Sequence, residues 1–448
     1  MSTLPSNLVQ ALLEAAAQAG ADAADAIALA GTSLSIDVRA GRLEQAERAE
    51  GRDLGLRVFV GQRSAIVSSS DIRAETMQAM AERAIAMARE APEDIHAGLA
   101  DPEQLARDTD MSALELCDPA PEPAPALLEE DARRVEAAAL ANSSISQVQS
   151  ASATYSAQQV AIAASNGFAG AYARTSRSLS CLAIAGEGLG MERDHDFDSR
   201  IFQRDLRPAE EIGAIAASRA VARLAPRPVR GGAFPVLFDE RVASSLIGHL
   251  VAAANGGAVA RGASWLRDAM GEQILPAGLD LIEDPHRPRT AASRLFDAEG
   301  LPTQRRAIIS GGNLTGWFLD LANARKLDLP STGNAARSVS GGISPTPWNL
   351  SLTQGEASRD DLLAQMGTGL WVTSMIGSTI NPNTGDYSRG AAGFWVENGE
   401  VVHPVSGVTI AGNLREMLRG AIPANDARAH LSTRVPSLLI EGLTLASQ

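Results

Sequence analysis

The chain has 448 residues and a formal net charge of −14 at pH 7. This length is too great for one ordinary hydrophobic core, which predicts two domains, and the acidic balance argues against direct nucleic-acid binding because it repels a phosphate backbone. Two cysteines, Cys117 and Cys181, are too few for a disulfide framework or a cysteine zinc site. No apolar run approaches the roughly 20 residues of a membrane span, and the first residues lack a signal-peptide pattern, so a cytoplasmic protein without membrane contact is expected.

Residues 1–224 are predicted to form an α+β domain in which helices cover one face of an antiparallel sheet. Apolar residues three to four positions apart predict helices, whereas strict alternation predicts strands. In chain order the prediction is a helix at 6–20, an antiparallel meander at 34–67, helices at 72–91 and 127–141, strands within 144–187 and a helix at 208–224. The meander is expected to break at its glycines, including Gly31 and Gly51, and Ser70 or Asp71 is expected to cap the following helix.

The segment "MERDHDFDSR" combines one histidine with several acidic residues. Alternation along a strand would place Asp194, Asp196 and Asp198 on one face and His195 on the other. A solvated strand edge is the interpretation that this pattern favours over a functional site.

After the linker "APRPVRGG", residues 233–448 are predicted to form a β-rich, barrel-like domain with one prominent helix. "FPVLFD" predicts a strand, and Asp239 is expected to cap the helix that carries His249. Short strands between glycine and asparagine turns follow, with hairpins expected at "SGGN" and "ENGE".

His249 raises the question of a metal site, because zinc peptidases use two histidines on one helix with a neighbouring acid that activates water. The residue after His249 is Leu250, and the residues four and five positions further on are Ala253 and Ala254. One imidazole cannot hold a catalytic zinc ion, which takes three protein ligands. His249 is therefore expected to be a core or interface residue, and the sequence predicts neither a catalytic residue nor a metal ligand in this chain.

The segment "GDYSRGAAGFWVENGEVVHPVSGVTIAGNLREM" places Asp386, Tyr387 and Arg389 before a run of small residues. Small residues allow close approach of a neighbouring strand or of an extended peptide. A packed hairpin with an Asp–Arg pair is the simpler interpretation, and a peptide-binding or interface role for these three residues and His249 is the functional one.

This segment, together with "LFDAEGLPTQRRAIISGGNL", "NARKL", "STGNA", "MGTGLWVT" and "VRAGRLEQAERAEGRDLGLRVFVGQRSAIVSSSD", resembles the TldD/PmbA family along essentially the whole chain, most closely its PmbA (TldE) branch. The resemblance implies a cytosolic peptidase of two subunit kinds that acts on unfolded or extended peptides. In that family the TldD branch binds zinc through a His-Glu-x-x-x-His helix and a cysteine near its C-terminus, and the PmbA branch lacks both. The tail "AHLSTRVPSLLIEGLTLASQ" likewise contains no cysteine.

The first hypothesis is therefore a non-catalytic PmbA-like subunit that binds no cofactor itself and forms a heterodimer with a TldD-like, zinc-binding chain. A metal-free homodimer that binds and regulates peptides or proteins is the alternative, since the family was also named for effects on DNA gyrase. An independent peptidase with a site built from dispersed histidines is a third hypothesis.

Overall fold

The computed structural model describes residues 5–447, and its first 200 residues build one long antiparallel sheet in the order β3-β2-β1-β4-β5-β6. The strands are β1 (Ala23–Arg39), β2 (Arg42–Val60), β3 (Arg63–Ser69), β4 (Ile145–Ala164), β5 (Ala169–Ala185) and β6 (Glu192–Arg200). The meander was predicted correctly, but the breaks at Gly31 and Gly51 are wrong. These glycines pair with each other inside β1 and β2, and a Cβ on Gly31 would lie 3.1 Å from the carbonyl oxygen of Ala157 on β4. Here glycine serves the close approach of a neighbouring strand.

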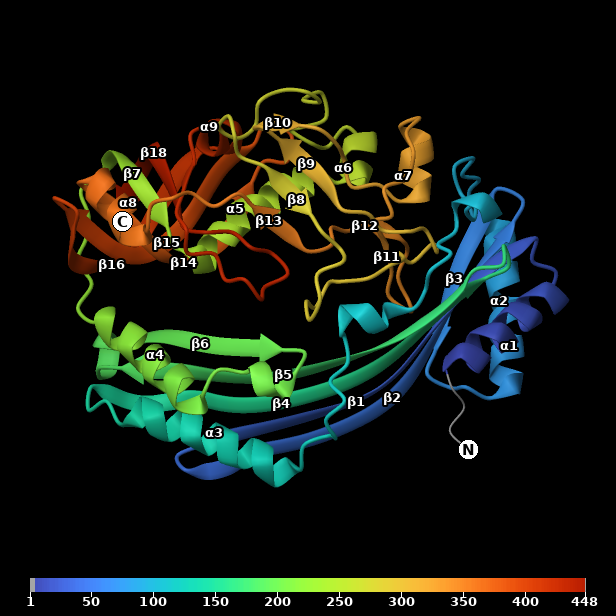
Figure 1. Ribbon diagram of the computed structural model, residues 1–448, viewed down its shortest axis with the longest axis horizontal. Helices are drawn as coiled ribbons and strands as arrows, with labels where there is room; N and C mark the ends of the chain where they lie inside the picture. Colours follow the sequence, from blue (N-terminus) through green and yellow to red (C-terminus); the bar gives the residue numbers. More distant parts are fainter. Residues whose placement is uncertain (1–4, 448) are drawn as a thin grey trace.

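Four helices cover one face of this sheet, as predicted (Figure 1). They are α1 (Pro5–Gln18), α2 (Ala74–Glu90), α3 (Pro125–Leu140) and α4 (Ala209–Ala222). Ala24, Ala26 and Ala28 of β1 are buried in one core with α1 and α2. Leu34, Ile36 and Val38 are buried in a second core with α3 and α4. Neither Ser70 nor Asp71 is the N-cap of α2, because the cap position is Arg73. Asp71 still accepts hydrogen bonds from the Arg73 backbone N–H at 3.0 Å and from the Thr76 hydroxyl at 2.8 Å.

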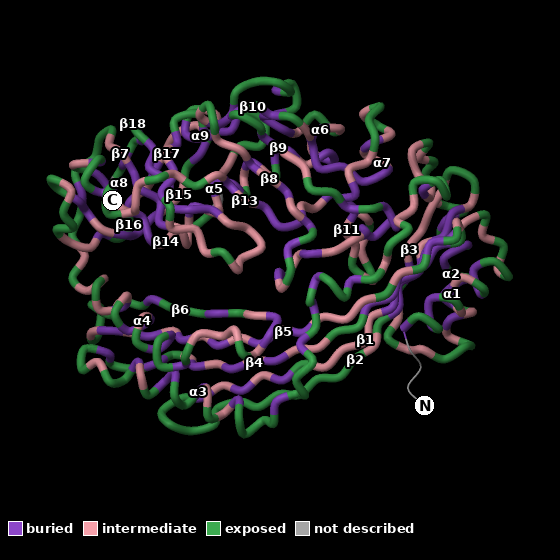
Figure 2. The backbone as a smooth tube through the Cα atoms, viewed as in Figure 1, coloured by how far each residue is buried: buried purple, intermediate pink, exposed green. Residues whose placement is uncertain are grey.

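The other face of the sheet curves beneath the second domain (Figure 1). Ile27, Val160 and Ile162 on this face form an apolar cluster with Phe168 and with Phe296 of the second domain. The sheet is therefore buried on both faces at this end, and the two domains share a core there (Figure 2).

Five strands of the second domain form a barrel-like sheet in the order β16-β15-β14-β7-β18, which closes through a further β16–β18 pairing. They are β7 (Gly232–Phe238), β14 (Gly369–Ile380), β15 (Asp386–Glu397), β16 (Glu400–Asn413) and β18 (Leu438–Ser447), and β17 (Ile422–Pro423) adds to β18. The helix α5 (Glu240–Ala253) packs Leu246, Ile247 and Leu250 into the same core as the strands. The prediction of a β-rich, barrel-like domain with a prominent helix is confirmed.

The remaining elements of the second domain are short. A sheet in the order β10-β9-β8-β13 consists of β8 (Leu281–Glu283), β9 (Arg306–Ser310), β10 (Asn313–Leu314) and β13 (Leu350–Leu352), and β11 (Ala335–Ala336) pairs with β12 (Ser344–Pro345). The helices are α6 (Gly256–Ala260), α7 (Leu321–Lys326), α8 (Arg359–Met366) and α9 (Leu414–Arg419). Within residues 5–447, no helix is both long enough and apolar enough to cross a membrane.

Candidate functional site

His249 lies on α5, whose start is fixed by Asp239, as predicted. The Asp239 carboxylate accepts a hydrogen bond from the Arg241 backbone N–H at 3.2 Å, which satisfies a free donor of the first turn. The His249 ring is half-buried and packs edge-on against Tyr387 of β15, with 6.1 Å between ring centroids. Its Nε2 atom is buried and has no hydrogen-bond partner among the described residues.

Strand alternation in β15 places Tyr387 and Arg389 on the α5 side and turns Asp386 away. The Tyr387 hydroxyl donates to Met375 Sδ at 3.5 Å, and Arg389 donates through Nε to the Gly377 carbonyl at 2.7 Å and through Nη1 to Ser245 Oγ of α5 at 3.3 Å.

Asp386 is exposed and accepts instead from Thr384 Oγ1 at 2.6 Å and Asn413 Nδ2 at 3.0 Å. The structure therefore brings together His249, Tyr387 and Arg389 but not Asp386. The Asp–Arg pair considered from the sequence does not form.

His249 of α5 and Tyr387 and Arg389 of β15 form a seam between the helix and the strand. Burial determines the charge of the two aromatic side chains, His249 and Tyr387. It lowers the pKa of His249, and the nearby Arg389 guanidinium lowers it further, so the imidazole is neutral at pH 7. Burial also raises the pKa of Tyr387 to about 12, which keeps the phenol protonated. The seam thus holds one neutral imidazole, one phenol and one guanidinium.

A zinc ion does not fit this seam. Zinc needs imidazole, thiolate or carboxylate ligands, whereas the charged group that acts on His249 is the Arg389 cation. Leu250 and Ala253 of α5, and Ala254 directly after it, are buried apolar residues. Across residues 5–447, no three His, Cys, Asp or Glu side chains are grouped so that they could hold a metal ion together.

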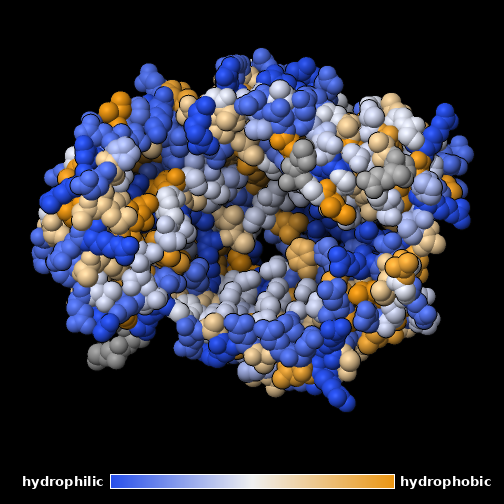
Figure 3. All heavy atoms as spheres, turned by 180° about the vertical axis from the view of Figure 1, so that it is seen from behind, coloured by the Kyte–Doolittle hydropathy of each residue, from blue (hydrophilic) through white to orange (hydrophobic). Residues whose placement is uncertain are grey.

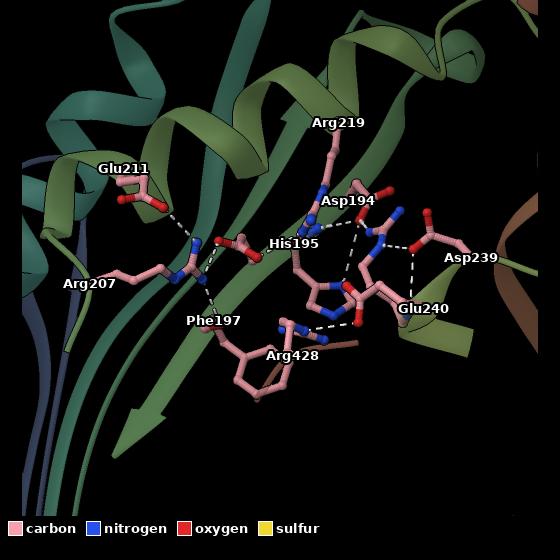
Figure 4. Close-up of polar contacts among 11 residues, drawn as sticks. Asp194, His195, Phe197, Arg207, Glu211, Arg219, Asp239, Glu240 and Arg428 are labelled. Atoms are coloured by element: carbon pink, nitrogen blue, oxygen red, sulfur yellow. Dashed lines mark hydrogen bonds and ion pairs between the residues drawn. The ribbon is translucent and has the colours of Figure 1, made fainter. Parts of the chain in front are cut away.

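The acidic strand β6 is not the solvated edge that the sequence suggested. His195 is exposed, but Asp194, Asp196 and Asp198 are buried beneath α4. Arg207 and Arg219 each contact Asp196 at 2.7 Å (Figure 4). Buried carboxylates require such partners, because an unpaired buried charge is costly. In the helix predicted at 208–224, Arg219 and Arg223 lie four positions apart and so share one face. This basic face was the sequence signal that could have indicated partners for the acidic strand.

The same charge network ties α5 to the first domain. Arg241, in the first turn of α5, contacts Asp194 of β6 at 3.2 Å and Asp239 at 2.9 Å (Figure 4). Glu240 pairs with Arg428 Nε at 2.9 Å. The helix that carries His249 therefore starts at a fixed point on the sheet of the first domain.

Family models match most of the chain. They describe PmbA/TldA metallopeptidase domain 1 over residues 24–88, the central domain over 118–224 and the C-terminal domain over 231–447. The metalloprotease PmbA of Escherichia coli O157:H7 is 39% identical over 418 residues, which cover 93% of this chain and 90% of that protein. A metalloprotease PmbA homolog of Haemophilus influenzae is 35% identical over 438 residues, covering 97% of this chain and 94% of that protein.

Solved structures share the fold. A proposed modulator of DNA gyrase from Bacteroides thetaiotaomicron has a TM-score of 0.90 and 28% identity, and the match covers 99% of this chain and 98% of that one. TldE from Thermococcus kodakarensis has a TM-score of 0.85, with 98% of this chain and 100% of that one covered, and at 20% identity it supports the fold alone. Together the family models and the curated relatives confirm the resemblance seen in the sequence: the chain belongs to the PmbA/TldD family of metallopeptidases.

Proposed function

We propose that this chain is a zinc-free subunit of a cytoplasmic two-chain metallopeptidase that acts on unfolded or extended peptides. Its partner would be a TldD-like chain that supplies the zinc ion and the activated water. Similarity to both kinds of protein supports this proposal, since a metalloprotease TldD homolog of Haemophilus influenzae is 25% identical over 228 residues, half of this chain.

One observation carries the proposal. The helix α5 presents a single imidazole, which is neutral and lies beside the Arg389 guanidinium. A neighbouring cation opposes metal binding, and Ala253, about one turn further along α5, has no donor atom in its side chain. The role left to this chain is to hold and orient a peptide, with the partly exposed Arg389 as a candidate for contacts to the peptide or to the partner and the buried Tyr387 packed behind it.

The test is reconstitution with a TldD-like chain from the same genome. Purified separately, this chain is expected to contain far less than one zinc ion per polypeptide by elemental analysis and to cleave an unstructured fluorogenic peptide no faster than buffer does. The mixture is expected to cleave the peptide faster than the partner alone.

Two outcomes would contradict the proposal. Stoichiometric zinc in the isolated chain, with cleavage abolished by His249→Ala, would favour an independent peptidase. Unchanged cleavage on mixing, with self-association in light scattering, would favour the metal-free homodimer.

A further inference from the structure

A cavity of about 330 Å³ lies between the concave face of the first domain's sheet and two loops of the second domain. Figure 3 shows the molecule hollowed near its centre. The sheet contributes hydroxyl and amide side chains to the cavity. The two loops of the second domain that line it lie at residues 289–291 and 430–432. The wall includes Arg174, Arg200, Arg289 and His430. Three guanidinium groups of a chain with net charge −14 thus line one internal space.

Arg174 of β5 has no carboxylate partner among the described residues. Its Nη1 donates to the Ala291 carbonyl, its Nη2 donates to the Ser293 carbonyl at 2.6 Å, and its guanidinium lies 4.9 Å from the Tyr172 ring centroid. These neutral partners leave its charge uncompensated, and burial lowers its pKa.

Arg287 adds a second uncompensated charge behind the cavity wall. It is only 8% exposed, and its Nη2 donates to the carbonyls of the two wall residues Leu431 and Ser432, at 3.2 and 2.6 Å. Its Nε and Nη1 atoms are buried without a hydrogen-bond partner in the described part of the chain. Burial, and then repulsion from Arg434, lower the pKa of Arg287 to about 10, against a weaker attraction from Asp284.

The carboxylates near the cavity are already engaged. Asp198 contacts Arg200 at 2.9 Å and His430 at 3.3 Å. Glu115 and Asp205 contact Arg289 at 2.8 and 3.1 Å. These pairs neutralise Arg200 and Arg289 but leave the charges of Arg174 and Arg287 without a contacting anion.

The floor of the cavity offers neutral donors for an anion. Ser156, Ser176 and Ser199 come from the adjacent strands β4, β5 and β6, and the hydroxyls of Ser176 and Ser199 lie 3.3 Å apart. Hydroxyl donors and guanidinium groups are the partners that carboxylates take in proteins, and a guanidinium fork matches the two oxygens of a carboxylate.

We propose that this cavity between the domains binds a carboxylate of an extended peptide, either its C-terminal carboxylate or an acidic side chain, with Arg174 as the principal contact. The inference rests on the proposed peptide-handling function and assigns a preference for acidic ligands to it. The excess positive charge inside an acidic chain would draw such a group into the cavity.

Binding of labelled peptides to the isolated full-length chain tests this proposal without the partner. Three eight-residue peptides with an N-terminal fluorescein share one unstructured sequence: one ends in a free carboxylate, one ends in an amide, and one ends in an amide but carries an internal Glu in place of Gln. Fluorescence anisotropy is measured for the wild type and for Arg174→Gln, Arg174→Lys and the exposed control Arg83→Gln.

We expect the free-acid or the Glu-containing peptide to bind at least about tenfold more tightly than the neutral amide, because a charge-assisted contact is lost in the amide. Which of the two binds tightly identifies the source of the carboxylate. Arg174→Gln should remove this preference, Arg174→Lys should retain part of it, and Arg83→Gln should not change it.

Equal binding of all three peptides to the wild type would overturn the proposal, whatever the variants do to folding. Binding of inorganic phosphate with no preference among the peptides would also overturn it, since the cavity would then take a small anion. Because no partner is present, this result is independent of the cleavage test, which can succeed while the peptide preference fails.

Discussion

Arg241 is predicted to couple the two domains, and replacing it with methionine tests this directly. The guanidinium contacts Asp194 at 3.2 Å and Asp239 at 2.9 Å, and all three side chains are at most 15% exposed. Removing one partner of a buried pair costs about 3–5 kcal/mol because it leaves a buried charge unpaired. Asp194 keeps Arg223 at 3.5 Å, so the expected loss lies at the lower end, about 3 kcal/mol.

The assay is urea unfolding followed by two signals. All five tryptophans lie between residues 265 and 395, so their fluorescence reports on the second domain, whereas far-ultraviolet circular dichroism reports on both domains. A loss of about 3 kcal/mol lowers the midpoint by about 1 M for a urea slope near 3 kcal/mol/M. Arg267→Met is the matched control, because its pair with Asp268 is exposed and no change in midpoint is expected.

The reasoning fails if Arg241→Met unfolds at the same urea concentration as Arg267→Met. A double-mutant cycle with Asp194→Asn separates the pair from other effects of Arg241, and a coupling energy near zero would show that the contact between the domains contributes nothing.

Three further predictions concern single sites. Burial, reinforced by Asp297, raises the pKa of Glu299 to about 8. The folded chain then keeps a proton that the unfolded chain releases above about pH 4.5, so the stability contributed by this group falls as pH rises from about 4.5 to 8. Glu299→Gln should therefore stabilise the chain more at pH 8 than at pH 5 in urea titrations, and equal effects at both values would refute this. A Cβ at Gly55 would overlap the Val339 carbonyl oxygen, whereas Gly51 has open space. Gly55→Ala should cost about 1–3 kcal/mol and lower the thermal midpoint well below that of Gly51→Ala. His249→Phe removes a buried, unpartnered nitrogen, so its thermal midpoint in differential scanning fluorimetry should equal or exceed that of the wild type, and a clear decrease would indicate an unrecognised hydrogen bond.

The layout of both domains could be predicted from local patterns. The alternation in β1 and β2 and the helical spacing around Leu246 and Ile247 reflect which face of each element is buried, and burial is what these periodicities record. The N-cap at Asp239 could be predicted because its side chain bonds a backbone N–H only two residues further along the chain.

Interactions between distant segments could not be predicted in this way. Asp194 pairs with Arg241 of α5, Asp196 pairs with Arg219 of α4, and Asp198 pairs with His430 of the second domain. None of these partners lies in the same local window, so the buried acidic face resembled a solvated one in the sequence. Arg174 meets its carbonyl partners 117 and 119 positions later, and no local window contains both. The sequence correctly grouped His249 with Tyr387 and Arg389 but wrongly included Asp386. Strand alternation places Asp386 on the opposite face of β15 from Tyr387 and Arg389, and applying it would have excluded Asp386.

The ion pair between Asp25 and Arg337 joins residues 312 positions apart, beneath the start of the first sheet. During synthesis the first domain leaves the ribosome long before this arginine is made, with Ile27, Val160 and Ile162 still uncovered by the second domain. Until the second domain is made, such a nascent chain exposes an apolar surface that can associate with other polypeptides. Chaperone demand should therefore peak when about two thirds of the chain has emerged and should end once Phe296 and Arg337 have docked.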